Sequence, residues 1–175
     1  LSEVMLQQTQ VQVVLPYFAR FVEALPDLPV LASAPLDRVL ALWSGLGYYT
    51  RARNLHAAAR LCMELHAGEL PRDPQALRAL PGIGRSTAGA ILAQAWGDRF
   101  AILDGNVRRV LARVHGIEGW PGTPAVEKRL WALAEAQLPH VAAGRALLRE
   151  PLRAVHVEAE EILRRRHIRR FKRAG

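Results

Sequence analysis

Apolar residues recur along most of the chain at the spacing of an amphipathic helix. In the stretch 36–42, apolar side chains stand at positions 36, 39, 40 and 42, and Asp37 lies in the first turn. Steps of three and four residues place side chains on one helix face, and an early acid complements the helix dipole. Strand-type alternation is scarce. The pattern therefore predicts an all-α fold.

Start and stop signals divide this pattern into many short helices. Asp73 followed by Pro74 marks a helix start, because proline lacks only an N–H group that the first turn leaves unpaired. Thr9 can cap a helix that Pro16 then bends. The predicted helices lie at 1–8, from 9 onward, at 36–42, at 51–66, from 74 to about 80, at 86–96, after 104 and at 126–138.

Two glycines interrupt the apolar runs of the stretch LPGIGRSTAGAIL, residues 80–92. Gly82 and Gly84 can take positive φ and lack a Cβ, so the chain can turn sharply and leave N–H groups open. Those N–H groups and the positive end of the next helix form a site for an anion, to which Arg85 can add a charged contact. An ordinary helical hairpin with a glycine turn is the alternative that PGIG alone leaves open.

Composition narrows the class of protein only partly. Half of the 175 residues are apolar, which suits one domain or a compact two-lobed one, and no run is long enough for a membrane helix. Cys62 is the single cysteine, so neither an internal disulfide nor secretion is expected. The net charge is +8, but residues 144–175 alone carry ten basic and four acidic side chains. Overall charge is therefore weak evidence for a nucleic-acid partner.

Several strings resemble one family of DNA repair enzymes. The hairpin string, followed by Asp104 in LDGNV, resembles the helix-hairpin-helix DNA glycosylases. The strings LSEVMLQQTQV, WSGLGYYTRARNLH and ILDGNVRRVLAR resemble the adenine DNA glycosylase (MutY) branch, over about residues 1–139. The resemblance implies a six-helix lobe at 2–97 that contains the hairpin at 74–97, and a partial second lobe at 98–140.

The resemblance also implies a reaction and a partner. Members of this branch remove adenine that is mispaired with 8-oxoguanine or guanine in double-stranded DNA. For this chain we expect the same substrate, a monomer, and a location in the bacterial nucleoid or a nucleus. A non-catalytic helix-hairpin-helix DNA-binding fragment is the alternative from another class of protein.

Two carboxylates match the catalytic residues of the family. Glu3 matches the general acid that protonates N7 of adenine, and Asp104 matches the group that stabilises the positive sugar. An apolar wall, supplied by Val4, Met5 and Leu6, would favour a protonated Glu3. The sugar cation needs an ionised carboxylate instead. Taken without the resemblance, Glu3 reads as a solvated helix acid and Asp104 as a helix N-cap.

Position 86 separates two kinds of glycosylase. Relatives similar to endonuclease III have a lysine there, which attacks the sugar through a Schiff base and cleaves the strand. Ser86 cannot form an imine, and the chain has only Lys128 and Lys172. We therefore expect a monofunctional hydrolase, with a bifunctional glycosylase/lyase as the alternative.

Other residues match positions at which the family contacts DNA. Gln8 and Tyr48 match residues that fill the gap left by the flipped adenine and hold the partner base. Gly82, Gly84, Arg85, Ser86 and Asn106 complete the expected DNA-contact set. Arg51 and Arg53 are expected to be solvated or to face phosphate. Core positions are expected for the tryptophans Trp43, Trp96, Trp120 and Trp131.

The resemblance ends near residue 140. The family has a four-cysteine loop for a [4Fe–4S] cluster there, whereas residues 141–175 form a divergent basic tail without cysteine. We therefore expect no cofactor or metal in this chain, and a protein that is incomplete at both ends. The tail is expected to be an arginine-rich helix or disordered.

Overall fold

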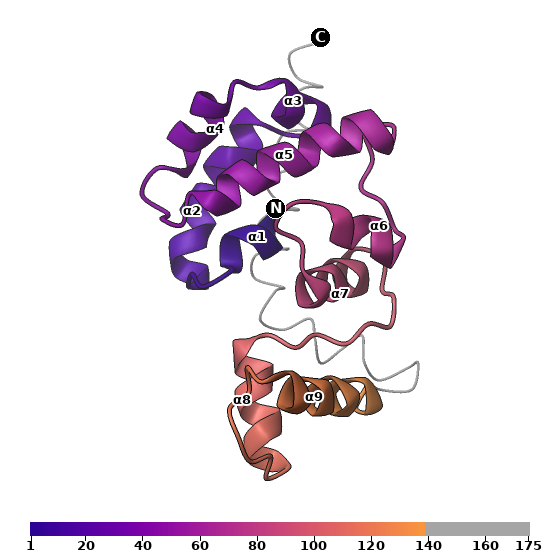
Figure 1. Ribbon diagram of the computed structural model, residues 1–175. Helices are drawn as coiled ribbons and strands as arrows, with labels where there is room; N and C mark the ends of the chain where they lie inside the picture. Colours follow the sequence, from indigo (N-terminus) through magenta and orange to yellow (C-terminus); the bar gives the residue numbers. More distant parts are fainter. Residues whose placement is uncertain (139–175) are drawn as a thin grey trace. The chain divides into compact units, whose positions relative to one another are not determined.

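The computed structural model describes residues 1 to 138, and this part is helical with no strand (Figure 1). The all-α prediction is confirmed. The predictions for the tail, 141–175, lie outside the described residues. The helices are α1 (Ser2–Leu6), α2 (Val11–Ala24), α3 (Leu28–Ser33), α4 (Leu36–Trp43), α5 (Thr50–Leu65), α6 (Pro74–Ala79), α7 (Arg85–Ala95), α8 (Gly105–Val114) and α9 (Pro124–Ala136).

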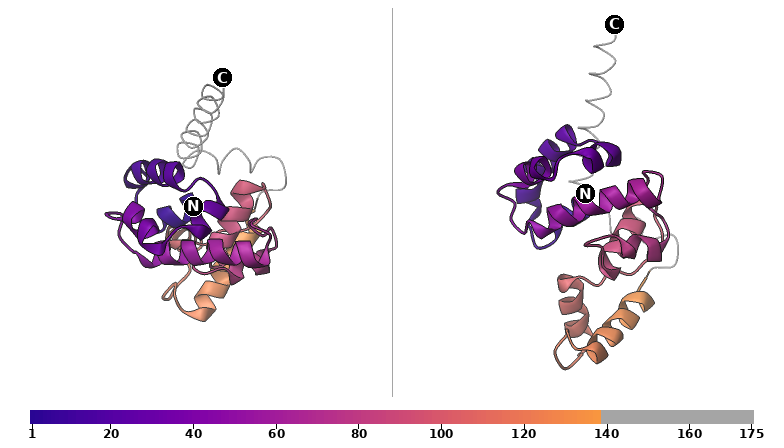
Figure 2. Two further views of the ribbon diagram at one scale, coloured as in Figure 1. Left: turned by 90° about the horizontal axis from the view of Figure 1, so that it is seen from above. Right: turned by 45° about the horizontal axis from the view of Figure 1, so that its top comes forward.

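The described residues divide into two compact units. The first, Leu1–Glu69, contains α1 to α5, and the second, which begins at Leu70, contains α6 to α9. This division falls before the hairpin, whereas the expected lobe boundary lies after residue 97, and that boundary stays a prediction. In the first unit α5 packs along α3 and α4, and in the second α8 packs against α9 (Figure 2).

The first unit is built around a continuous apolar core. Phe21 and Trp43 meet edge to face with their ring centroids 6.0 Å apart, and both are buried. The short helix α1 joins this core through Met5, which is fully buried, and Val4. Because isolated helices of this length are unstable in water, α1 depends on this packing and on its contacts with other segments.

The second unit has its own core beneath α8 and α9. Leu103, Leu111 and Leu130 are buried there together with Trp131. The predicted helix start at Asp73 is confirmed, because its carboxylate accepts hydrogen bonds from the N–H groups that open α6. Helix packing and capping thus agree with the sequence signals in this unit.

Some expected details of the fold are wrong. Thr9 does not cap α2, which begins after Gln10 without a side-chain cap, while the Thr9 hydroxyl donates to the carbonyl of Gln7. Trp120 lies 76% exposed in the turn before α9 and is not a core residue. Its flanking glycines and prolines place it on a turn, where no helix face carries it inward.

Candidate active site and DNA-contact residues

Glu3 lies in the first turn of α1 and is half-buried. Its chain neighbours Val4 and Met5 are buried in the core, and Leu6 is half-buried. The apolar neighbours expected from the sequence are thus packed into the core, and an apolar wall around the Glu3 carboxyl itself stays a prediction. The Glu3 side chain keeps partial access to the surface, and a general acid needs such access in order to contact the nucleobase that it protonates.

Gln8 and Tyr48 share an unusual backbone conformation. Their φ angles are 56° and 48°, in the left-handed region, and within the described residues only Ala67 joins them among non-glycine residues. This conformation costs an L-residue roughly 1–2 kcal/mol, so the surrounding structure must hold it in place. Both side chains are exposed, Tyr48 to 60%. Two of the three described non-glycine residues with positive φ are thus residues that we expect to contact DNA where the flipped adenine has left the stack.

Arg51 corrects a prediction, because it is neither solvated nor available to phosphate. The side chain is 8% exposed and bonds backbone carbonyl oxygens in two other segments. Its Nη1 donates to Met5 O at 2.7 Å and to Gln7 O at 2.6 Å, and its Nη2 donates to Gly47 O at 3.3 Å. Sequence spacing did not reveal this role, since the acceptors are backbone atoms, and those of Met5 and Gln7 lie more than 40 residues away in the chain.

The glycine hairpin between α6 and α7 is present, but its two glycines differ. Gly82 has φ 75°, as a sharp turn requires. Gly84 has φ −79° and is extended, which corrects the expectation that it takes positive φ. A Cβ at Gly84 would meet nothing within 4 Å, so this position faces open space. Ile83 is buried and anchors the turn.

The start of α7 has no side-chain cap among the described residues. Gly84 is its N-cap and has no side chain to bond the first turn. The helix has 11 residues, so its dipole adds positive character at this end. Open space at Gly84 and a helix start without a side-chain cap are compatible with the predicted anion site, which stays a prediction.

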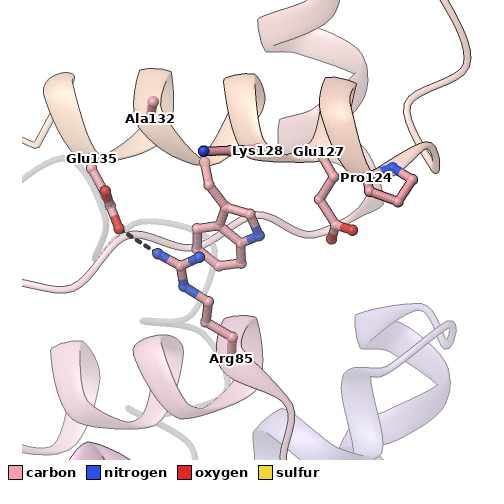
Figure 3. Close-up of a pocket in the computed structure, with 7 residues that line it drawn as sticks. Arg85, Pro124, Glu127, Lys128, Ala132 and Glu135 are labelled. Atoms are coloured by element: carbon pink, nitrogen blue, oxygen red, sulfur yellow. Dashed lines mark hydrogen bonds and ion pairs between the residues drawn. The ribbon is translucent and has the colours of Figure 1, made fainter.

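Arg85 points from α7 toward α9 (Figure 3). Its guanidinium lies 3.8 Å from the centroid of the Trp131 ring and pairs with the carboxylate of Glu135. A shallow pocket here is lined by Arg85, Pro124, Glu127, Lys128, Trp131, Ala132 and Glu135. Arg85 therefore links the hairpin to α9, and its contact with phosphate stays a prediction.

One hydrogen bond ties Ser86 to the residue that directly precedes Asp104. The Ser86 hydroxyl accepts from the N–H of Leu103 at 3.1 Å, directly before Asp104 in the chain. Asp104 is exposed and caps α8, with its Oδ1 accepting from the N–H of Val107 at 2.8 Å. The N-cap interpretation is thus confirmed, and the cap uses one of the two carboxylate oxygens.

Asn106 lies exposed in the first turn of α8, near Asp104. Its Oδ1 accepts from the Nη2 of Arg109 at 3.0 Å. The expected site residues accordingly form two groups, one in each unit. The first group is Glu3, Gln8 and Tyr48, and the second is Gly82, Gly84, Arg85, Ser86, Asp104 and Asn106.

The residues present do not fit an iron–sulfur cluster. Cys62 is the single cysteine of the chain and is buried in α5, where burial raises the pKa of its thiol. Between residues 1 and 138, no group of three or more His, Cys, Asp or Glu side chains could hold a metal ion. His56 is buried in α5, with its Nε2 3.0 Å from the carbonyl of Ala34. In the same range no helix is both long and apolar enough to cross a membrane.

An all-helical fold with a glycine hairpin leading into a capped helix is the architecture of helix-hairpin-helix proteins. The chain belongs to the HhH-GPD superfamily of base excision DNA repair proteins, whose family model matches residues 1–136. The resemblance stated from the sequence is confirmed by this match.

Sequence relatives are named adenine DNA glycosylase. The chain is 45% identical over 139 residues to the protein of Buchnera aphidicola subsp. Baizongia pistaciae, covering 79% of this chain and 39% of the relative. It is 48% identical over 135 residues to the Homo sapiens protein, covering 77% and 25%. The chain thus spans about two fifths or less of the length of these relatives.

Solved structures of DNA glycosylases share the fold. A thermostable thymine-DNA glycosylase matches with a TM-score of 0.71 and 27% identity, covering 79% of this chain and 64% of that one. A trapped endonuclease III–DNA covalent intermediate matches with a TM-score of 0.66 and 27% identity, covering 75% and 66%. These matches confirm the helix-hairpin-helix glycosylase fold, while the roles of individual residues stay predictions.

Proposed function

We propose that this chain is the catalytic part of an adenine DNA glycosylase, which hydrolyses the N-glycosidic bond of adenine opposite 8-oxoguanine or guanine. The observation that carries the proposal is the pairing of Ser86 with the backbone beside Asp104, in a chain whose relatives are named for this activity. That pairing supports the proposal because it ties position 86, to which we assign the reaction type, to the residue that directly precedes Asp104.

The proposed reaction divides the work between two carboxyl groups. Glu3 donates a proton to N7 of adenine, so that the base leaves with the electron pair of its bond to C1′. Asp104, ionised, stabilises the positive charge on the sugar, and water adds to C1′ while its proton passes to the carboxylate of Glu3 or Asp104. The products are free adenine and an intact strand with an abasic site. The assignment of the two roles rests on the match of Glu3 and Asp104 to the family's carboxylates, and Glu3 is half-buried whereas Asp104 is exposed.

The proposed reaction stops at the abasic site because position 86 carries no amine. Cleavage of the strand by these enzymes begins when an amine attacks C1′ and forms an imine. The Ser86 hydroxyl cannot form one, and it is engaged with the Leu103 N–H. This arrangement favours hydrolysis over the lyase alternative.

DNA is held, in this proposal, from both units. The start of α7, which has no side-chain cap among the described residues, binds backbone phosphate, a contact without sequence preference. Gln8 and Tyr48, both exposed, contact the bases where adenine has left the stack. The acting unit is one chain, and its location is the bacterial nucleoid or a nucleus.

A non-catalytic DNA-binding role is the second candidate, because the glycine hairpin and the start of α7 could bind phosphate without any reaction. One experiment separates the two: single-turnover release of adenine from an 8-oxoguanine:adenine duplex, measured for this chain beside a full-length relative. Release above the uncatalysed rate supports the enzyme. Duplex binding without release, while the relative turns over, supports the binding role and overturns our proposal.

A further inference from the structure

Arg51 is a buried cation, and within residues 1–138 its side-chain hydrogen bonds all end on backbone carbonyl oxygens. Its Nη1 reaches the carbonyls of Val4, Met5 and Gln7, and its Nη2 those of Leu46 and Gly47, at distances between 2.6 and 3.5 Å. One guanidinium therefore connects the end of α1 to the loop between α4 and α5. A buried charge normally requires a counter-charge, so five carbonyl dipoles in its place call for an explanation.

The carbonyls that Arg51 bonds include the two that decide the strained conformations. Gln7 directly precedes Gln8, and Gly47 directly precedes Tyr48. Holding a carbonyl oxygen fixes the plane of the peptide that follows, and that plane forms one side of the next residue's φ. The guanidinium thus holds, at the same time, the peptide planes in front of both left-handed residues.

Two further contacts orient the guanidinium. Its central carbon lies 5.4 Å from the centroid of the buried Trp43 ring and 5.3 Å from that of Tyr48. The Trp43 Nε1 also donates to Gly47 O at 3.0 Å, and the Arg51 N–H donates to Tyr48 O at 2.9 Å. The loop before Tyr48 is therefore tied both to the core and to the start of α5.

Only an arginine has the geometry for this task. Its planar group carries separate nitrogens that donate in different directions, whereas a lysine offers a single nitrogen. The carbonyls at the end of α1 also form the negative end of that helix, where a cation is favourable.

We propose that Arg51 is the positioning residue that holds Gln8 and Tyr48 together in their left-handed conformations, so that both meet DNA as one preformed surface. The contact with DNA rests on the proposed function, whereas the hold on the two conformations does not. The experiments below therefore test the two parts separately.

Hydrogen–deuterium exchange of the free chain tests the hold. Arg51→Lys should raise exchange about tenfold or more in peptides that cover 1–10 and 44–50, with unchanged exchange from α6 to α9. Arg60→Ala, an exposed arginine on the same helix, is the matched control and should change neither segment. Loosening of only one segment, or of neither, overturns the proposal.

A double-mutant experiment separates positioning of the two residues from general stabilisation of the fold. It also tests the proposal if Arg51→Lys destabilises more of the chain than segments 1–10 and 44–50. Glycine takes positive φ without strain, so Gln8→Gly removes one of the conformations that Arg51 has to hold. The fall in urea midpoint caused by Arg51→Lys should then be clearly smaller in the Gln8→Gly background. An equal fall in both backgrounds would mean that Arg51 only stabilises the fold.

Duplex binding tests the functional part. Arg51→Lys should lower the preference for an 8-oxoguanine:adenine duplex over a matched duplex by about fivefold or more, with affinity for the matched duplex unchanged. Adding Gln8→Ala to the Arg51→Lys chain should then cause no further loss of preference for the mispaired duplex. Additive losses overturn the functional part. A chain that binds no duplex, yet loosens both segments on Arg51→Lys, contradicts the proposed function and leaves the hold on the two conformations supported.

Discussion

Asp104 combines two roles that use different parts of one carboxylate. Its Oδ1 caps α8 through the N–H of Val107, a role that any good capping side chain could fill. The proposed stabilisation of the sugar cation depends on negative charge instead. A neutral side chain of the same shape should therefore separate the two roles.

We expect Asp104→Asn to keep the cap and lose the reaction. Asparagine caps as well as aspartate, so the melting temperature should stay near that of the parent chain, while base release falls by about 100-fold or more. Asp104→Ala should lose both, with a further loss of about 1 kcal/mol in the free energy of unfolding. Thermal unfolding and single-turnover kinetics give the two readouts. Normal release by Asp104→Asn would exclude a role for the charge.

Glu3→Gln should abolish base release while duplex binding persists. The amide preserves the shape of the side chain on α1 but cannot donate an acidic proton, and general acid catalysis contributes about 10²–10⁴-fold. Single-turnover release and duplex affinity are measured on the same preparation. Glu23→Gln, on α2, is a control that should leave release unchanged. A Glu3→Gln chain that keeps more than half of the parent rate would remove Glu3 from the mechanism.

Ser86→Lys should add imine formation and strand cleavage to the reaction. The amine would stand at the start of α7 beside the residue that precedes Asp104, where it could attack C1′ and form an imine. Borohydride trapping and strand cleavage without alkali should both increase, whereas the parent chain should show little of either. If an active Ser86→Lys chain gains neither, position 86 does not face the sugar.

At the scale of secondary-structure elements, the hairpin owes its openness to Gly84. Its φ of −79° is accessible to any residue, and a Cβ there would meet open space. Gly89, one helical turn further along α7, is different, because its Cβ would lie 2.5 Å from the carbonyl of Ala101. Gly84 keeps the surface at the start of α7 free of a side chain, whereas Gly89 permits close packing of α7 against the backbone of Ala101.

We therefore expect Gly84→Val to weaken binding to all duplexes alike and leave thermal stability nearly unchanged. The added side chain would block phosphate without straining the turn, and phosphate contacts carry no sequence information. Gly89→Ala, the contrasting variant, should lower the melting temperature, because the backbone in front of it must shift. Affinities for matched and mispaired duplexes, with melting curves, provide the test. Selective loss on one mispair after Gly84→Val would contradict the phosphate assignment.

The helices were predictable from the sequence to within a few residues where apolar periodicity and capping agreed, as at α4, α6 and α9. Helix α3 was missed because its six residues are too few for periodicity, although Asp27 as N-cap and Pro29 in its first turn were visible signals. The expected site residues all lie on or beside helix ends. Arg51 and the left-handed conformations were not predictable, since they depend on backbone atoms that only the fold brings together.

At the scale of the whole molecule, charge is unevenly distributed along the chain. Residues 144–175 carry ten of the 24 basic side chains, whereas the proposed DNA contacts all lie before residue 107. Non-specific electrostatic affinity for DNA and affinity from the proposed site contacts should therefore come from different parts of the sequence.

A chain ending at residue 138 should bind matched duplexes less tightly and with a weaker dependence on salt. Each phosphate contact that is lost reduces the slope of log affinity against log salt by about 0.9. Preference for the mispaired duplex should survive, because it depends on the base contacts. Titrations at several salt concentrations, for the full and shortened chains, supply both quantities. An unchanged slope would mean that the tail does not touch DNA.

Arg51, which bonds the carbonyls that precede Gln8 and Tyr48, affects how a profile of reaction rate against pH is interpreted. Burial lowers the pKa of Arg51, yet a guanidinium keeps its proton throughout the range in which a glycosylase is assayed. Had a histidine donated to the same carbonyls, a rise in pH would remove one of its N–H donors, loosen the DNA-contacting surface and distort the profile. With an arginine in this place, a change of rate with pH can be assigned to groups that exchange protons with the base or the sugar.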